Sequence, residues 1–311
     1  MAFRRVVVAN STGNYTVCQP LSPPPSAEDL AERLIVMSAL GRNPKKPTMN
    51  LLATMKSNNL VLHPIDFDKG RNSTTFTYAS IIRRIKLMYD DIKTRPSDDI
   101  ILFIDAYDVH IQQPAHEIVR RFKNQPYKIL FASEYTCMHS KPDTCSAQEG
   151  QEKIAKGHYL NGGGMMGRAG VISEWLGDKL KRPYPGKEVG IKDQNDQTVF
   201  GYWYTTDHPL VGLDTTELLF LNMFRRDQKK WHTIGGCAGE PKSMYICEEM
   251  GDECIIPAVV HWNGGSKRST TAKRMNHFWL RSQQAEGLRA SHSFKRHSVF
   301  YPGSADFIGS T

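Results

Sequence analysis

Short apolar runs alternate along the chain with stretches in which apolar residues recur every three or four positions. The runs at 3–10, 60–67, 98–105 and 128–133 are rich in β-branched residues and typical of buried strands. Residues 78–92 and 115–123 have helical apolar spacing, which predicts an amphipathic helix in each. Strands that alternate with helices predict an α/β fold, in which helices flank a mostly parallel central sheet.

The remaining segments carry weaker signals. A proline-rich turn leads into residues 26–37, where Ser26 as N-cap and apolar Leu30, Leu34 and Met37 predict a helix. Residues 41–50 are predicted to be a loop. In the second half we expect a glycine loop at 161–164, a helix near 171–181, an acidic segment at 192–200, and strands at 211–220 and 258–260.

Length and composition favour a single large domain. The chain has 311 residues, of which 40% are hydrophobic and 23% charged, so it can bury a sizeable core. No internal repeat is visible. We therefore expect one domain over residues 1–270, followed by a basic C-terminal extension over residues 271–311, which packs on the domain or trails it.

Charge and cysteine content leave partner and compartment open. The net charge of +8 suits an anionic partner, either nucleotide phosphates or nucleic acid, but dispersed surface Lys and Arg would give the same value. Six cysteines without a CxxC pair make structural zinc unlikely, and Cys137 with Cys145 reads equally well as a disulfide or as two thiols. No run of 18 apolar residues occurs, so we expect no membrane insertion and a cytoplasmic location unless a leader was removed.

Acidic residues directly after a buried strand are candidates for ligand binding, because ligands of open parallel sheets lie beyond the carboxyl ends of the strands. Asp105 and Asp108 stand there, and His261 follows a second apolar strand. Two carboxylates and an imidazole can hold a divalent cation that neutralises a diphosphate. Separately, the two Asp could cap a turn and His261 could be a hydrogen-bonded core histidine. The combination favours a metal site.

Glycines and amides near these positions suggest close approach to a ligand. Residues 161–164 would let Asn161 reach sugar hydroxyls or phosphate, or they form an ordinary turn. After His261, small flexible residues and Lys267 would contact a leaving diphosphate. Asp196 could orient or deprotonate an acceptor hydroxyl, or it could cap a helix N-terminus.

Five motifs occur in an order that resembles the glycosyltransferase domain of procollagen lysyl hydroxylases. They are FIDAYDV, YLNGGGMMG, DQNDQTVF, VGLDTTELLFLNMF and VVHWNGGSK, and the similarity runs from about residue 6 to residue 267. The resemblance implies a GT-A fold, a UDP-sugar donor such as UDP-glucose or UDP-galactose, and Mn²⁺ or Mg²⁺ as the metal. The implied acceptor is a hydroxyl group, on collagen-like hydroxylysine or on a glycan.

The resemblance also implies roles for individual residues. It makes Asp105, Asp108 and His261 metal ligands, packs Tyr107 on the uridine, lays Asn161, Gly163 and Gly164 along the sugar and diphosphate, and sets Asn263, Gly264 and Lys267 on the phosphates. Asp196 and its neighbour Asn195 would face the reacting sugar. Asn10 would contact the base, and Arg83 or Arg84 a phosphate.

Two departures from the family pattern leave donor and acceptor undetermined. Asn195 stands where the family usually has Asp, and Met138 where a tryptophan is usual in the collagen enzymes. Glycosylation of a hydroxymethylated nucleic-acid base, or nucleotide-sugar binding without catalysis, are the alternatives. The chain has no room for the family's hydroxylase domain, so collagen lysine hydroxylation is not predicted.

Overall fold

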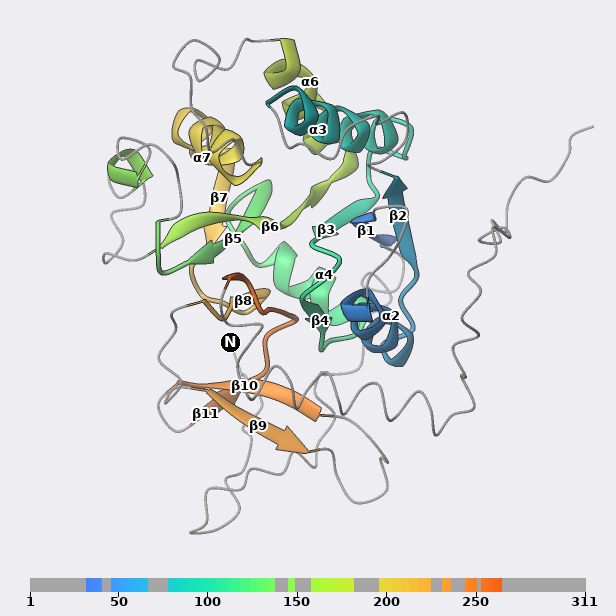
Figure 1. The fold of residues 1–311 in the computed structure, drawn as a ribbon, viewed down its shortest axis with the longest axis vertical. Helices are drawn as coiled ribbons and strands as arrows, with labels where there is room; N and C mark the ends of the chain where they lie inside the picture. Colours follow the sequence, from blue (N-terminus) through green and yellow to red (C-terminus); the bar gives the residue numbers. More distant parts are fainter. Residues whose placement is uncertain are drawn as a thin grey trace, which may run out of the picture.

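A computed structural model gives the arrangement of the chain (Figure 1). It describes residues 32–40, 46–66, 78–137, 145–148, 158–181, 196–224, 231–235, 244–250 and 253–264. The expected first strand at 3–10 and the extension at 271–311 lie outside these residues.

A six-stranded sheet forms the centre, in the order β2-β1-β3-β6-β5-β7. Five of its strands run parallel, and β6 is antiparallel to both of its neighbours. This mostly parallel sheet was predicted. Its strands are β1 (Leu34–Leu40), β2 (Leu62–Asp66), β3 (Ile100–Ile104), β5 (Ile129–Glu134), β6 (Tyr159–Arg168) and β7 (Val211–Asp214).

Helices cover both faces of this sheet, as Figure 1 shows. One face packs against α3 (Tyr78–Ile92), α6 (Ala169–Lys181) and α7 (Asp196–Asp207). The other packs against α2 (Lys46–Ser57) and α4 (Ala115–Lys123). Because apolar side chains meet both faces, all five residues of β3 are buried. Among the described residues, no helix combines the length and hydropathy needed to cross a bilayer.

Two small sheets complete the described fold. The first, in the order β4-β12-β8, consists of β4 (Val109–Ile111), β8 (Phe220–Asn222) and β12 (Val259–His261). The second contains β9 (Trp231–Gly235), β10 (Met244–Met250) and β11 (Glu253–Ile255), and the side chain of Gln112 exchanges two hydrogen bonds with the backbone of Ile246 in β10. Sequence patterns did not predict β4, β9, β10 or β11.

The helices and strands with the strongest sequence patterns were predicted correctly, and several of those with weak patterns were not. The helix at 26–37 is wrong where it can be checked, because Leu34–Leu40 forms β1, a buried central strand that apolar content alone does not distinguish from a helix. The loop at 41–50 is wrong from Lys46, where α2 begins. The single strand at 211–220 is two strands, since the buried Asp214 carboxylate accepts from the N–H groups of Leu219 and Phe220 and closes a turn between them.

The glycine cluster is also not a loop. It forms β6, whose residues are almost all buried in the middle of the sheet. Glycine is required there because other groups come close: a Cβ at Gly164 would lie 2.7 Å from the ring of Phe220 and 3.1 Å from Ala132. β6 therefore brings glycine backbone into the region that the site occupies.

A buried ion pair fixes the segments that lead into β8 and β12. Glu117 of α4 accepts hydrogen bonds from Arg120 and Arg121, and Arg121 also donates to the backbone carbonyls of Leu218 and Ile256. Burial favours the neutral acid, but the two arginines outweigh it, so the pKa of Glu117 is lowered. Glu117 thus holds the guanidinium that ties these two segments together.

Replacing Glu117 by Leu is expected to lower the free energy of unfolding by about 3–5 kcal/mol, because it leaves the buried Arg121 without its carboxylate. Urea unfolding monitored by circular dichroism would measure this. In the control Asp90→Asn, which breaks exposed pairs of Asp90 with Lys86 of α3 and with Lys93 just after it, the change should be much smaller. Equal losses in both variants would contradict the structural role of Glu117.

Candidate functional site

One polar pocket lies where the central sheet meets the β4-β12-β8 sheet. Four of its side chains are carboxylates, and amides and glycines make up most of the rest. It is lined by Asp105, Asp108, Glu134, Asn161, Gly162, Gly163, Asp196, Gln197, Phe224, His261, Asn263 and Gly264. Such a concentration of negative charge is costly unless a cation is bound within it.

Asp105, Asp108 and His261 converge on one point of this pocket. Asp105 follows β3 directly, and β4 pairs with β12 so that Val109 stands opposite His261. The Nε2 atom of His261 lies 3.4 Å from Asp105 Oδ2 and 3.3 Å from Asp108 Oδ1. One ligand atom from each of the three residues lies within 4.8 Å of the others. Two sheets therefore assemble a cluster from residues more than 150 positions apart.

The orientation of His261 is fixed by Asn222, the last residue of β8. Asn222 Nδ2 donates to the Ser133 carbonyl at 2.6 Å, which leaves Oδ1 to face His261 Nδ1 at 2.9 Å. Nδ1 must then carry the proton that it donates to Asn222. Consequently Nε2 is the nitrogen that faces Asp105 and Asp108 and can bind an ion in place of its proton, an arrangement common among metal-binding histidines.

The charge state of His261 reflects the two carboxylates. Burial lowers the pKa of His261, but hydrogen bonds and Coulomb attraction from Asp105 and Asp108 outweigh burial and raise it to about 10. The pocket thus attracts positive charge to Nε2. A proton and a divalent cation meet the same demand there, and the Asp-Asp-His set is chemically suited to Mn²⁺ or Mg²⁺.

Replacing Asn222 by Leu should weaken Mn²⁺ binding about 10- to 100-fold, because the His261 ring loses the partner that fixes its tautomer and angle. Calorimetric titration of Mn²⁺ would measure the change in Kd. The same substitution at the exposed Asn124, after α4, serves as the control and should leave the Kd unchanged. If Asn222→Leu also binds Mn²⁺ normally, Asn222 does not orient a metal ligand.

Gly163 is packed directly against the cluster. Its carbonyl accepts from the N–H of Asp105, and an added Cβ would overlap His261 Cε1 and lie 2.9 Å from Asp105 Oδ2. Glycine is therefore needed here for close packing rather than for an unusual backbone angle.

We expect Gly163→Ala to weaken Mn²⁺ binding about tenfold or more, since the methyl group must push His261 or Asp105 out of place. The comparison is Gly177→Ala in α6, where the nearest atoms belong to the movable Tyr89 ring at 3.2 Å or more. Calorimetry and thermal unfolding on both variants would separate a local from a global effect. Normal Mn²⁺ affinity in Gly163→Ala would show that the packing tolerates the methyl group.

Glu134, at the end of β5, is the centre of a network of amides. Its Oε1 accepts from Gln197 Nε2 at 2.5 Å, and its Oε2 accepts from Asn263 Nδ2 at 2.8 Å. Burial raises the pKa of Glu134, while the three amides oppose that shift. A single carboxylate thus orients two side chains around the pocket, Gln197 and Asn263.

Asp196 stands at the first position of α7 and faces the pocket. Burial raises its pKa and the charge of Asp105 raises it further, whereas Arg84 of α3 lowers it from 4.0 Å away. It lies at a helix N-terminus, where its charge is favourable, and it also lines the pocket. The two positions are compatible, so neither alternative for Asp196 is excluded.

Most residues predicted for the site come together. The pocket contains Asp105, Asp108, His261, Asn161, Gly163, Asn263, Gly264 and Asp196, whereas Tyr107 and Gly164 are not among its lining residues. Asn10, Asn195 and Lys267 lie outside the described residues. Gly162 and Gln197 lie in segments that were predicted to approach the ligand but were given no role, and Glu134, Phe224 and Asn222 were missed. Glu134 could have been found, because it ends a buried strand just as Asp105 follows one.

Comparison with known proteins assigns the chain to a family. The family model of the PLOD GT domain matches residues 79–277, more than half of the chain. The chain belongs to the PLOD GT domain family. Membership confirms the predicted resemblance and the glycosyltransferase class of enzyme. The mixed sheet flanked by helices confirms the predicted α/β fold.

Curated relatives share about half of this chain. The multifunctional procollagen lysine hydroxylase and glycosyltransferase LH3 of Homo sapiens is 26% identical over 174 residues, which are 55% of this chain and 21% of that protein. The procollagen-lysine,2-oxoglutarate 5-dioxygenase of Drosophila melanogaster is 36% identical over 176 residues, 55% of this chain and 22% of that protein. The chain therefore matches about a fifth of the length of these relatives.

Solved structures of glycosyltransferases resemble the overall architecture at low identity. A glycosyltransferase involved in glycosylation of the major capsid of PBCV-1 has a TM-score of 0.44 and 13% identity, with 80% of this chain and 99% of that chain covered. The galactosyltransferase LgtC, solved with donor and acceptor sugar analogues, has a TM-score of 0.43 and 11% identity, with 81% and 99% covered.

Proposed function

We propose that this domain moves a hexose from a UDP-sugar to a hydroxyl acceptor in a reaction that requires a divalent cation, Mn²⁺ or Mg²⁺. The observation that carries the proposal is the convergence of Asp105, Asp108 and His261 in an acidic pocket. An anionic diphosphate would be repelled from four carboxylates, so its binding there needs a cation.

In this proposal each part of the pocket has a distinct task. When bound, the cation neutralises the charge of the diphosphate in the donor and in the leaving UDP. Asn263, Gly264 and Lys267 contact the phosphates, and the glycines of β6 leave space for the sugar. Asp196 and Asn195 lie beside the reacting sugar. Catalysis comes chiefly from positioning and from charge stabilisation at the leaving group.

The proposed acceptor is a hydroxyl of a protein or glycan, with collagen-like hydroxylysine as the first choice. Support comes from the similarity to LH3, whose name combines procollagen lysine hydroxylation with glycosyl transfer. UDP-glucose and UDP-galactose are the proposed donors.

Release of UDP from a panel of UDP-sugars, with Mn²⁺ or with EDTA, would test the proposal. Hydroxylysine peptides, glycans and hydroxymethylated DNA serve as acceptors, and His261→Ala serves as the variant. We expect one donor to be turned over with Mn²⁺ only, and with a peptide or glycan acceptor. Transfer to DNA would replace the proposed acceptor class. Binding of a donor without any turnover would favour an inactive nucleotide-sugar binding protein.

A further inference from the structure

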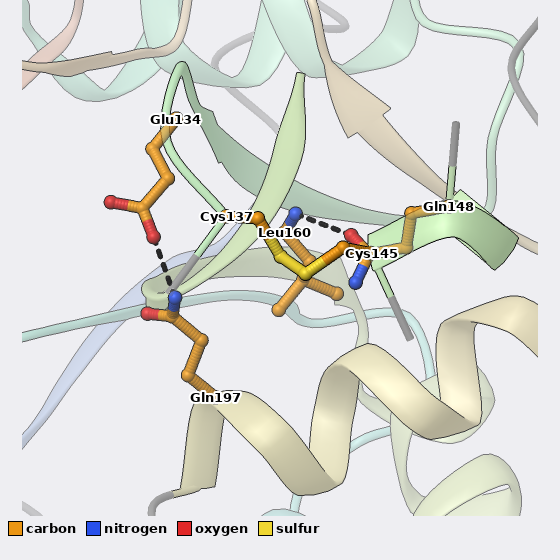
Figure 2. The surroundings of a disulfide bond; sticks show 6 residues. All are labelled: Glu134, Cys137, Cys145, Gln148, Leu160 and Gln197. Carbon is orange, nitrogen blue, oxygen red and sulfur yellow. Dashed lines mark hydrogen bonds between the residues drawn. A yellow bond between two sulfur atoms is a disulfide. The ribbon is translucent and has the colours of Figure 1, made fainter. Parts of the chain in front are cut away.

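A disulfide ties the segment after β5 to a short helical turn (Figure 2). Cys137, three residues beyond Glu134, is bonded to Cys145, the first residue of the turn at 145–148. The bond therefore holds this turn beside the strand end that carries Glu134. None of the roles proposed above uses the disulfide or the turn.

The same turn makes a second connection, to β6. Gln148 is fully buried, and its Oε1 accepts a hydrogen bond from the backbone N–H of Leu160 at 2.8 Å. Figure 2 shows the Gln148 side chain reaching Leu160 next to the disulfide. Leu160 directly precedes Asn161, a pocket residue. One turn is thus linked covalently to the segment after β5 and by a buried hydrogen bond to β6.

The start of β6 needs such a connection. Pairing between β5 and β6 shifts register between Phe131 and Ala132, where the partner changes from Met165 to Asn161. Beyond the shift only three paired positions remain, with Asn161, Leu160 and Tyr159 opposite residues 132–134. A short, interrupted pairing fixes a strand weakly, so an additional buried hydrogen bond has a large share in holding it.

Both sides of this junction carry pocket residues. Glu134 and Asn161 both line the pocket, where the Asn161 amide favours the charged form of Glu134, and Asn161 Oδ1 accepts from the N–H of Gly163 at 2.9 Å. A displacement of β6 at Leu160 would alter the position of Asn161, and through it Glu134 and Gly163. Even a small displacement of these side chains would change the rate of transfer strongly, because reacting groups must be aligned.

We propose that Gln148, held in place by the Cys137–Cys145 disulfide, is a positioning residue that fixes Asn161 and Glu134 for the transfer step. Its effect on the reaction rests on the proposed function. The disulfide makes the position of Gln148 sensitive to dithiols: a dithiol transfers two electrons and two protons to the bond, two cysteine thiols form, and the dithiol becomes a disulfide. Reduction frees the turn and with it Gln148.

The test combines amide hydrogen exchange over residues 158–163 with donor KM, kcat and Mn²⁺ affinity. Gln148→Met keeps the size of the side chain but removes the acceptor, Gln148→Glu keeps an acceptor oxygen, and Ser146→Ala changes an exposed residue of the same turn. Gln148→Met, and the wild type reduced with dithiothreitol, should exchange about tenfold faster at Leu160 and lose about tenfold in kcat, with donor KM and Mn²⁺ affinity nearly unchanged. Gln148→Glu should recover part of both losses, and Ser146→Ala should match the wild type.

The double variant Cys137→Ser, Cys145→Ser shows whether this disulfide is the one that responds to reduction. It should resemble reduced wild type, and dithiothreitol should not change it further. Unchanged exchange at Leu160 in Gln148→Met would overturn the proposal, as would a parallel fall in kcat, Mn²⁺ affinity and thermal stability, which indicates general destabilisation. If the wild type transfers no sugar, the proposed function fails by itself. Exchange at Leu160 then still decides whether Gln148 fixes β6.

Discussion

Asp108→Asn is expected to lower the rate of sugar transfer about a thousandfold or more and to remove its dependence on Mn²⁺. Asp108 is only 12% exposed and lies 3.3 Å from His261 Nε2, whereas Asp105 is more exposed. Because water screens the charge of Asp108 less, we expect its carboxylate to contribute more than that of Asp105 to binding a cation. A loss of about 4 kcal/mol of charge stabilisation at the leaving diphosphate corresponds to that factor. Initial rates of UDP release across an Mn²⁺ titration would measure it.

The control for this variant is Asp98→Asn, an exposed carboxylate just before the opposite end of β3. It should transfer sugar at the wild-type rate with the same Mn²⁺ requirement. Substantial activity of Asp108→Asn, unaffected by EDTA, would show that catalysis does not depend on a cation at this position.

Glu134→Gln is expected to lower kcat about a hundredfold while leaving Mn²⁺ affinity nearly unchanged. The two oxygens of Glu134 accept hydrogen bonds from Gln197 and Asn263, and an amide can offer an acceptor to only one of them. Whichever of Gln197 and Asn263 loses its acceptor would turn away from its present position in the pocket. Misalignment of a single group lowers the rate of a reaction by a factor of this order.

The matched control is Glu174→Gln, an exposed residue of α6 with the same chemical change. Steady-state kinetics together with Mn²⁺ calorimetry would distinguish a catalytic from a metal-binding defect. If Glu134→Gln retains wild-type kcat, the amide network does not contribute to transfer. A fall in Mn²⁺ affinity equal to the fall in kcat would instead assign Glu134 to the metal site.

The parts of the fold that sequence predicts well are those in which local pattern and tertiary packing agree. The helix Tyr78–Ile92 was predicted with its observed bounds because Ile81, Ile85 and Met88 form one apolar face, which packs on the sheet. The first part of β1, up to Met37, was predicted as helix because its apolar run is buried on both faces, so alternation gives no signal. The glycines of β6 indicate a loop by local propensity, while packing against Phe220 and His261 keeps them in a strand.

The same distinction separates the site residues that were found from those that were missed. Asp105 and His261 each come at the end of an apolar strand, where a position in sequence predicts a position in space. Asn222 acts through contacts to Ser133 and His261, which lie 89 and 39 residues away, so no local pattern reveals its role. Gln148 likewise depends on contacts that form only after folding.

The central claim is that Asp105, Asp108 and His261 hold a divalent cation that in turn binds the diphosphate of the donor. Calorimetric titration of UDP into the protein, with saturating Mn²⁺ and with EDTA, tests it most directly. The account predicts binding at one site with Mn²⁺, at least tenfold weaker binding with EDTA, and loss of the Mn²⁺ effect in His261→Ala. Equal affinity for UDP in Mn²⁺ and in EDTA, in both wild type and His261→Ala, would contradict it.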